Sequence, residues 1–200
     1  MEIMPIFPKL VAITNINRDL TSSEKKVIET EYKNNKTNNT SNHIGQDKYV
    51  LDNPKLKSIK KFIEEQIAVY VKTGLCHDVE YYITISWLNF TSKNQSHHKH
   101  THSNSILSGV FYVDVIDGVD SITFSDSSYN RIEIIPTESN NLNAKEWTFP
   151  VKNGDLFLFD SSISHEVKTN KEEHLRTSIA FNTFVRGEFG KYGKATYLKI

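Results

Sequence analysis

The feature that most restricts the fold is a change in the spacing of apolar residues at about residue 79. From there on, apolar residues alternate with polar ones in short runs, which is the period of a β-strand with one buried face. Turn signals at Asp117-Gly118 and Asn153-Gly154 separate some of these runs and favour antiparallel strands. We therefore predict a mainly β fold with flanking helices, a sandwich or jelly roll, with strands at 80–90, 105–116, 121–125, 130–136, 146–150, 154–160 and 175–186.

The part of the chain before residue 79 has helical periodicity. Behind a capping Asp52 or Asn53, apolar residues recur at steps of three and four, which predicts an amphipathic helix that covers the sheet. A second helix is expected over residues 20–32, with Thr21 or Ser22 as its cap. The helix that follows Asp52 and Asn53 is expected to bury one face, which consists of Leu56, Ile59, Ile63, Ile67 and Tyr70.

The remaining N-terminal segments complete the predicted organisation. Residues 6–13 suit a strand, and the Asn-rich residues 33–48 read as an exposed loop that buries nothing. With 200 residues and no internal repeat, one domain over 1–200 is expected. We divide it into a helical N-terminal part, about 1–78, and a jelly-roll core, about 79–200.

Charge and cysteine content limit the partners and the compartment. Twenty-four basic residues balance 24 acidic ones, so the net charge gives no reason to expect a nucleic acid or an anionic membrane as partner. No apolar run reaches the roughly 18 to 20 residues of a membrane span. The single cysteine, Cys76, excludes an internal disulfide, and the start of the chain has no signal-peptide pattern. We expect a cytoplasmic protein, and a homodimer is compatible with this composition.

The strongest chemical signal is a cluster of histidines in the segment SHHKHTH. Four of the eight histidines fall within six residues there. Alternate residues of an extended segment point the same way, so His100 and His102 can present two neutral imidazoles to one metal ion. The alternative is a solvated polar loop that binds metal adventitiously. We expect the neighbouring His97 and His98 to be surface residues.

Two later segments add a third imidazole and a cation. His165 follows the apolar strand of GDLFLFDSSISHEV, and by itself it would be an ordinary turn residue. Arg176 and Ser178 share one face of a strand, and an arginine that points into a sheet needs an anion, for which a carboxylate is the natural choice. The alternative is a surface strand on which Arg176 pairs with a neighbouring glutamate.

Together these motifs resemble those of the iron(II)- and 2-oxoglutarate-dependent oxygenases. The similar segments are SWLNF at 86–90, HTHSNSILSGVFYV at 100–113, GDLFLFDSSISHEV at 154–167 and RTSIAFN at 176–182. They look like a small bacterial and viral branch of that superfamily. The resemblance implies a double-stranded β-helix, a cupin-like jelly roll, with Fe(II) and the cosubstrate 2-oxoglutarate at its mouth.

The resemblance also implies roles for individual residues. His100 and His165 would bind the metal, and Arg176 with Ser178 would bind the far carboxylate of 2-oxoglutarate. At His102 the general pattern has a carboxylate, and the similar branch also has histidine there. His102 is therefore either a third metal ligand, which we prefer, or leaves an open position that water or a halide could fill.

Two more residues are candidates near the mouth. Asn89 ends an inward face that begins at Tyr81, so it is expected to contact cosubstrate or substrate. Tyr112 could donate its hydroxyl to the cosubstrate, although an aromatic residue in a strand is more often core. Asp160 is a candidate for orienting a histidine ligand.

The function that these motifs predict is an oxygenase that hydroxylates a C–H bond and releases succinate and CO2. One alternative is a cupin-like three-histidine dioxygenase, which would need neither Arg176 nor Ser178. Another is a non-catalytic jelly-roll binding module whose histidines are incidental. The substrate, a small molecule or a peptide, is not specified by the sequence.

Overall fold

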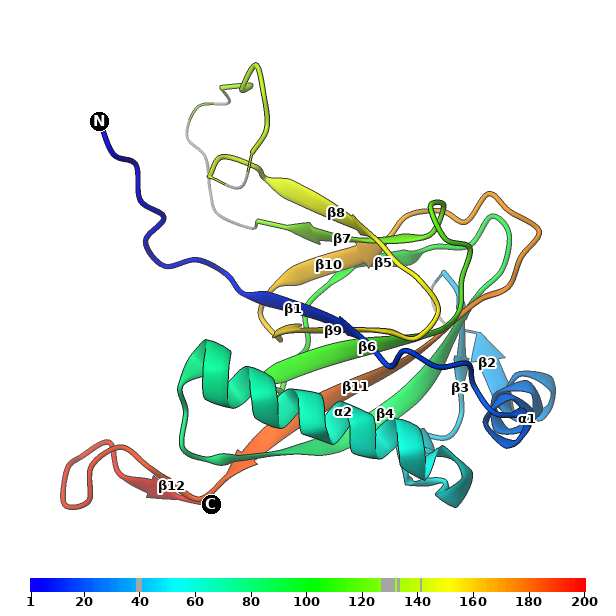
Figure 1. Ribbon diagram of the computed structural model, residues 1–200, viewed down its shortest axis with the longest axis horizontal. Coiled ribbons are helices and arrows are strands. Elements are labelled where there is room, and N and C mark those ends of the chain that lie inside the picture. The colour runs from blue at the N-terminus through cyan, green and yellow to red at the C-terminus, as the bar shows by residue number, and fades with distance from the viewer. Residues whose placement is uncertain (39–40, 127–131, 133, 141) are drawn as a thin grey trace.

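Two antiparallel sheets that face each other make up the body of the protein (Figure 1). The computed structural model describes residues 1–38, 41–126, 132, 134–140 and 142–200. The larger sheet has the strand order β1-β9-β6-β11-β4-β3-β2. Its strands are β1 (Val11–Asn15), β2 (Lys36–Asn38), β3 (His43–Gly45), β4 (Glu80–Thr91), β6 (Leu107–Asp114), β9 (Asp155–Asp160) and β11 (Arg176–Arg186).

The smaller sheet has the order β5-β10-β7-β8. Its strands are β5 (His97–His100), β7 (Ser121–Ser125), β8 (Glu146–Pro150) and β10 (Ser164–Val167). From β4 onward the chain crosses repeatedly between the two sheets, which is the connectivity of a jelly roll. A short hairpin of β12 (Glu188–Phe189) and β13 (Leu198–Lys199) follows. The expected mainly β fold with flanking helices is therefore confirmed.

Two helices lie against the larger sheet on the face away from the smaller one (Figure 1). They are α1 (Ser22–Thr30) and α2 (Lys57–Tyr70), each continued by a π-helical turn, Glu31–Asn35 and Val71–Leu75. Two 3-10 turns, Val50–Asp52 and Pro54–Leu56, lead into α2, and Asn53 caps the second of them through Lys55 N. Among the described residues, no helix is long and apolar enough to cross a membrane.

The larger sheet is buried on both faces. On its helix side, the expected apolar face of α2 packs against residues such as Leu88, Phe111 and Phe181. On its other side, Tyr112 and Phe157 belong to a second cluster that lies between the sheets. Each fully buried apolar side chain stabilises the fold by about 1.5 to 3 kcal/mol, so the larger sheet is a firm platform for the groups that line the space between the sheets.

The helix α1 begins as the sequence predicts. Thr21 accepts a hydrogen bond from Glu24 N, and the Glu24 side chain accepts one from Thr21 N, which together form a capping box. Arg18 also donates two hydrogen bonds to the Glu24 carboxylate, at 2.7 and 2.9 Å. The start of the helix is thus fixed by the sequence around it.

The predicted strand at residues 6–13 is wrong in its first half, because β1 begins only at Val11. Pro5 and Pro8 have no backbone N–H to donate to a sheet, and Phe7 between them has a left-handed φ of 62°. The first ten residues are exposed instead.

The prediction that residues 33–48 form only an exposed loop is also wrong. β2 and β3 pair with each other there, and β3 continues the larger sheet by pairing with β4. Asn42, at 1% exposure, is buried. Strand pairing uses backbone groups, so a polar segment can join a sheet without apolar side chains.

Of the strands expected after residue 79, β7 and β8 have the expected bounds and β4, β6, β9 and β11 lie within two residues of them. The strand expected at 130–136 falls partly outside the described residues, and its described residues 132 and 134–136 are not in a strand. The expected inward face from Tyr81 to Asn89 is wrong in its first half. An extra residue in β4 between Ile83 and Ile85 shifts the register, so Tyr81 and Ile83 pack on the helix side.

Candidate metal and cosubstrate site

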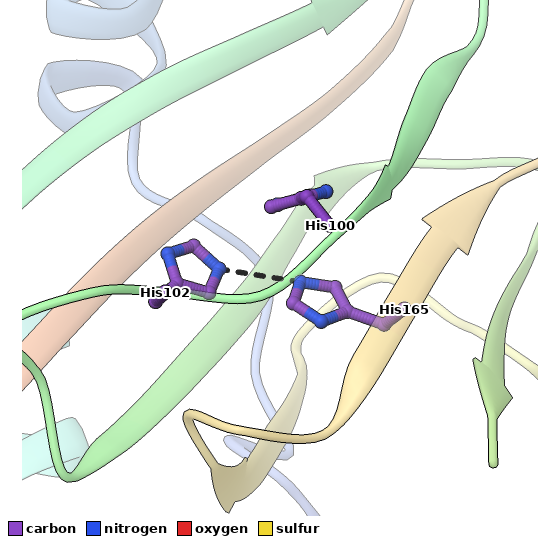
Figure 2. A group of neighbouring side chains, drawn as sticks. All are labelled: His100, His102 and His165. Carbon is purple, nitrogen blue, oxygen red and sulfur yellow. Dashed lines mark hydrogen bonds between the residues drawn. The ribbon is translucent and has the colours of Figure 1, made fainter. Parts of the chain in front are cut away.

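The pairing of β5 with β10 brings the distant histidines together. His100 lies directly opposite His165 in this antiparallel pair, and His102 follows two residues after His100. One ring nitrogen from each of the three residues lies within 4.8 Å of the others. Figure 2 shows the His102 and His165 rings facing each other, with their Nε2 atoms 3.3 Å apart. Within the described part of the chain, this group has the geometry to hold a metal ion.

Backbone carbonyls orient two of the three imidazoles. The carbonyl of Ile163 lies 3.0 Å from His165 Nδ1, and the carbonyl of His98 lies 2.7 Å from His100 Nδ1. A carbonyl can only accept, so each Nδ1 carries the proton and each Nε2 keeps its lone pair. Metal-binding histidines commonly have this arrangement, in which a hydrogen bond to the second nitrogen fixes the ring.

Burial keeps the three imidazoles in the neutral form that binds metals. It lowers the pKa of His165 to about 3, although the hydrogen bond to Ile163 opposes the shift. Burial and the nearby His100 lower the pKa of His102 to about 4, and burial also lowers the pKa of His100. At neutral pH no proton therefore competes with a metal for these nitrogens.

A small network of buried hydroxyls anchors the segment that carries His102. The backbone N–H of His102 donates to the carbonyl of Ser161 over 2.9 Å. The Ser161 hydroxyl lies 2.8 Å from the hydroxyls of both Ser105 and Ser108. His102 does not lie in a strand, and these bonds tie it to the turn that leads to His165.

Three polar side chains form a row across the inner face of the larger sheet. Ser178 on β11 pairs directly with Asn89 on β4 and with Tyr112 on β6. Directly paired residues of adjacent strands point to the same face, so the three side chains are neighbours. These are three of the residues that the sequence analysis assigned to the cosubstrate.

Arg176 lies two residues before Ser178 and is 5% exposed. Its guanidinium lies over the Tyr112 ring, 5.4 Å from the ring centre, and its Nη1 is 3.8 Å from Asp120 Oδ1. The alternative of a surface arginine paired with a glutamate is therefore wrong. Asp120 was missed by the sequence analysis, and only its place in the turn before β7 could have drawn attention to it.

One cavity joins the histidines to this row. It is lined by Trp87, Asn89, His97, His100, His102, Val110, Tyr112, Ile122, His165, Glu166, Val167, Arg176, Ser178 and Ala180. All seven residues that the sequence analysis proposed for the site are in this lining. The structure thus brings them together in a single space between the two sheets.

Two buried polar atoms in this cavity lack a partner among the described residues, Asn89 Oδ1 and the Tyr112 hydroxyl. Burial raises the pKa of Tyr112 to about 12, against the opposing charge of Arg176, so its hydroxyl keeps its proton. Buried polar atoms without a partner cost free energy, which a polar ligand would recover. The Tyr112 hydroxyl can donate, and with Arg176 and Ser178 it fits a carboxylate-bearing ligand, whereas Asn89 Oδ1 can accept from a donor on a ligand.

The position predicted for His97 at the surface is wrong. Between His97 and His100 the pairing with β10 contains one extra residue, because His97 pairs with Val167 and His100 with His165. This bulge turns both side chains to the same side, and their rings stack 4.5 Å apart. His98 is exposed, as expected. Asp160 is exposed and accepts a hydrogen bond from Ser162 N.

A family model described as "Putative 2OG-Fe(II) oxygenase" matches residues 85–182. This segment of the chain belongs to the 2OG-Fe(II) oxygenase family. The matched residues include the three histidines, Arg176 and the row formed by Asn89, Ser178 and Tyr112. No curated protein matches the sequence.

Solved structures of low sequence identity share the fold. An oxidoreductase of the 2OG-Fe(II) oxygenase family from Burkholderia pseudomallei has 11% identity and a TM-score of 0.60, over 86% of this chain and 83% of that one. A prolyl hydroxylase from Trichoplax adhaerens has 12% identity and a TM-score of 0.58, over 87% and 83%. HygX from Streptomyces hygroscopicus, with nickel and 2-oxoglutarate bound, has 8% identity and a TM-score of 0.58, over 88% and 82%. At such identities these likenesses establish the double-stranded β-helix.

The donor set suits the ion that the family name implies. Three neutral imidazoles suit divalent iron, zinc, copper or nickel, and a charged carboxylate is not required for binding. His102 stands where the general pattern that the resemblance implies has a carboxylate.

Proposed function

We propose that this protein is an Fe(II)- and 2-oxoglutarate-dependent oxygenase that hydroxylates a C–H bond and releases succinate and CO2. The observation that carries the proposal is a shared cavity. Three histidine nitrogens within 4.8 Å of one another line the same space as buried Arg176. A metal site and a carboxylate-binding site in one cavity are what a bifunctional cosubstrate requires.

The residues divide into two groups by their chemistry. His100, His102 and His165 would hold Fe(II), which when bound supplies the oxidative chemistry with dioxygen and 2-oxoglutarate. Arg176 would pair with the far carboxylate, and Ser178 and Tyr112 would each donate a hydrogen bond to it. Asn89 would contact the cosubstrate or the substrate. The burial of the row also excludes water from the cosubstrate.

Iron titration under anaerobic conditions tests this proposal, followed by measurement of succinate formed from 2-oxoglutarate after oxygen is admitted. We expect one Fe(II) per chain and succinate that depends on both iron and 2-oxoglutarate. Iron binding without any use of 2-oxoglutarate would support the cupin-like dioxygenase instead. If the protein binds no iron, the non-catalytic binding module is the remaining alternative.

The substrate is proposed only by class, as a small molecule or a peptide. The zero net charge supports neither a nucleic acid nor a membrane as partner. The lone cysteine is exposed and is compatible with a reducing compartment, for which we propose the cytoplasm. Candidate substrates are added once succinate formation without a substrate has been measured. A true substrate is expected to increase the turnover of 2-oxoglutarate above that level.

A further inference from the structure

An acidic residue stands behind Arg176. Asp120 is 8% exposed, and its Oδ1 lies 3.8 Å from Arg176 Nη1. Its Oδ2 accepts a 2.8 Å hydrogen bond from Ile116 N, so the turn between β6 and β7 fixes the carboxylate. Arg176 lines the cavity and Asp120 does not. The carboxylate therefore meets the guanidinium from outside and leaves the cavity-facing N–H groups to a ligand.

Among the described residues, one acidic residue is in the cavity lining, Glu166. Glu166 belongs to the lining, but it follows His165 on β10, and successive side chains of a strand point to opposite faces. A hydrogen bond to Glu146, and then the charge of Glu166, raise the pKa of Lys99, which puts Glu166 near that exposed lysine. Among the described residues, the acidic side chain that pairs with Arg176 is Asp120.

The formal charges of the loaded site balance when Asp120 is counted with Arg176. Three neutral imidazoles leave both positive charges of Fe(II) uncompensated, and Arg176 adds a third. The dicarboxylate brings only two negative charges. Where the residue at position 102 is acidic, that ligand supplies the third. In this chain, position 102 is histidine, and the third negative charge stands at Asp120, on the Arg176 side of the cavity.

We propose that Asp120 is a positioning residue that replaces, at Arg176, the negative charge that an acidic residue 102 would supply at the metal. The inference rests on the proposed function. It means that Asp120 moderates the affinity for dicarboxylates, because it already compensates part of the charge of Arg176. Removing charge at residue 120 and adding charge at residue 102 should then have opposite effects on 2-oxoglutarate binding.

Calorimetric titration of 2-oxoglutarate into the Ni(II)-loaded full chain tests this inference. Asp120→Asn keeps an oxygen that can accept from Ile116 N, and we expect it to bind 2-oxoglutarate about tenfold more tightly than the parent. His102→Asp should bind it about tenfold more weakly, and the double variant should return to within about threefold of the parent. The matched control is Asp117→Asn in the same turn, where the side chain is 64% exposed and pairs with Lys152. This control should leave the affinity unchanged.

Asp120→Asn and His102→Asp are expected to change the affinity for 2-oxoglutarate in opposite directions. This distinguishes charge balance from a purely structural role of Asp120. If Asp120→Asn binds 2-oxoglutarate more weakly than the parent, or equally, the inference fails while the proposed function stands. If the parent itself does not bind 2-oxoglutarate, both fail.

A second variant covers the case in which Asp120→Asn does not fold, as judged by circular dichroism. Asp120→Glu keeps the charge on a longer side chain, and it should bind 2-oxoglutarate within about threefold of the parent. If Asp120→Glu binds 2-oxoglutarate about tenfold or more weakly than the parent, the exact position of the carboxylate matters and not its charge. That result would overturn the inference.

Discussion

The imidazole of His165 illustrates how single residues are prepared for the proposed chemistry. It is 5% exposed, and its Nδ1 is held by the Ile163 carbonyl. The same burial that lowers its pKa to about 3 leaves Nε2 aimed at His102. The two facing nitrogens are thus placed to bind one metal ion.

At the residue scale, Arg176 gives the first prediction. Arg176→Ala should weaken 2-oxoglutarate binding by about 2 to 5 kcal/mol, because a buried, charge-assisted contact is lost, while metal affinity stays nearly the same. Calorimetric titration with Ni(II) and then with 2-oxoglutarate measures the metal affinity and the cosubstrate affinity separately. Arg186→Ala is the control, since Arg186 lies at the exposed end of the same strand over the Tyr82 ring. Equal affinity of Arg176→Ala and the parent would refute the cosubstrate assignment.

The role of His102 is the second prediction. His102→Asp should retain metal binding with changed turnover, because a carboxylate is shorter than an imidazole and the metal must shift. A displacement near 1 Å can cost about a hundredfold in rate. His102→Ala should bind the metal less tightly than the parent or His102→Asp. The readouts are iron stoichiometry and succinate formation for the three proteins side by side. If all three behave alike, His102 is not a ligand and the site contracts to His100 and His165.

At the element scale, α1 gives a prediction about pH. Burial alone would raise the pKa of Glu24, but the hydrogen bonds from Arg18 and Thr21 outweigh it and lower the pKa. A lowered pKa in the folded state means that the stabilisation is present above the unfolded value of about 4.3 and disappears as the pH falls through the folded value. Glu24→Gln should thus lower the free energy of unfolding by about 1.5 to 3 kcal/mol at pH 7, and by less at pH 3.

Urea denaturation at several pH values checks this prediction. Glu29→Gln is the matched control, because Glu29 is exposed on the same helix. A parent-to-variant difference that stays constant from pH 7 to pH 3 would contradict the assignment of the stabilisation to the Glu24 charge.

The elements that the sequence predicted well are those with a regular apolar period. Ile59, Ile63 and Ile67 define the buried face of α2, and the alternation in β7 and β8 gives their bounds. The position of Asn89 could be anticipated because the alternation of β4 is regular from Ile85 to Asn89, after the extra residue. Periodicity works where apolar and polar residues alternate, or recur at helical steps, over the whole element.

The strands β5 and β10 could not be predicted as strands, although they carry the histidines. Each has four residues, and β5 consists of three histidines and a lysine, so neither shows an apolar alternation. Pairing with β7 and the bulge at His97 determine their faces, and both are contacts between residues distant in sequence. Asp120 was missed for the same reason, because its partner Arg176 lies on another strand.

At the scale of the whole molecule, the site spans both sheets. The histidines lie on or beside strands of the smaller sheet, and Arg176 and the polar row lie on the larger one. A cosubstrate held at both ends would tie the sheets together. We expect Ni(II) alone to raise the unfolding temperature and 2-oxoglutarate to raise it further, since a ligand at a hundred times its Kd stabilises by about 2.7 kcal/mol. The second rise should be lost in Arg176→Ala, and its persistence there would contradict a cosubstrate that bridges the sheets.

The central claim is that His100, His102 and His165 bind one metal in the cavity that Arg176 shares. A crystal structure of the full chain with Ni(II) and 2-oxoglutarate tests it most directly. We predict one ion with a nitrogen of each histidine at about 2.0 to 2.2 Å and a carboxylate of 2-oxoglutarate against the Arg176 guanidinium. An ion bound elsewhere, or His165 turned away from it, would contradict the account.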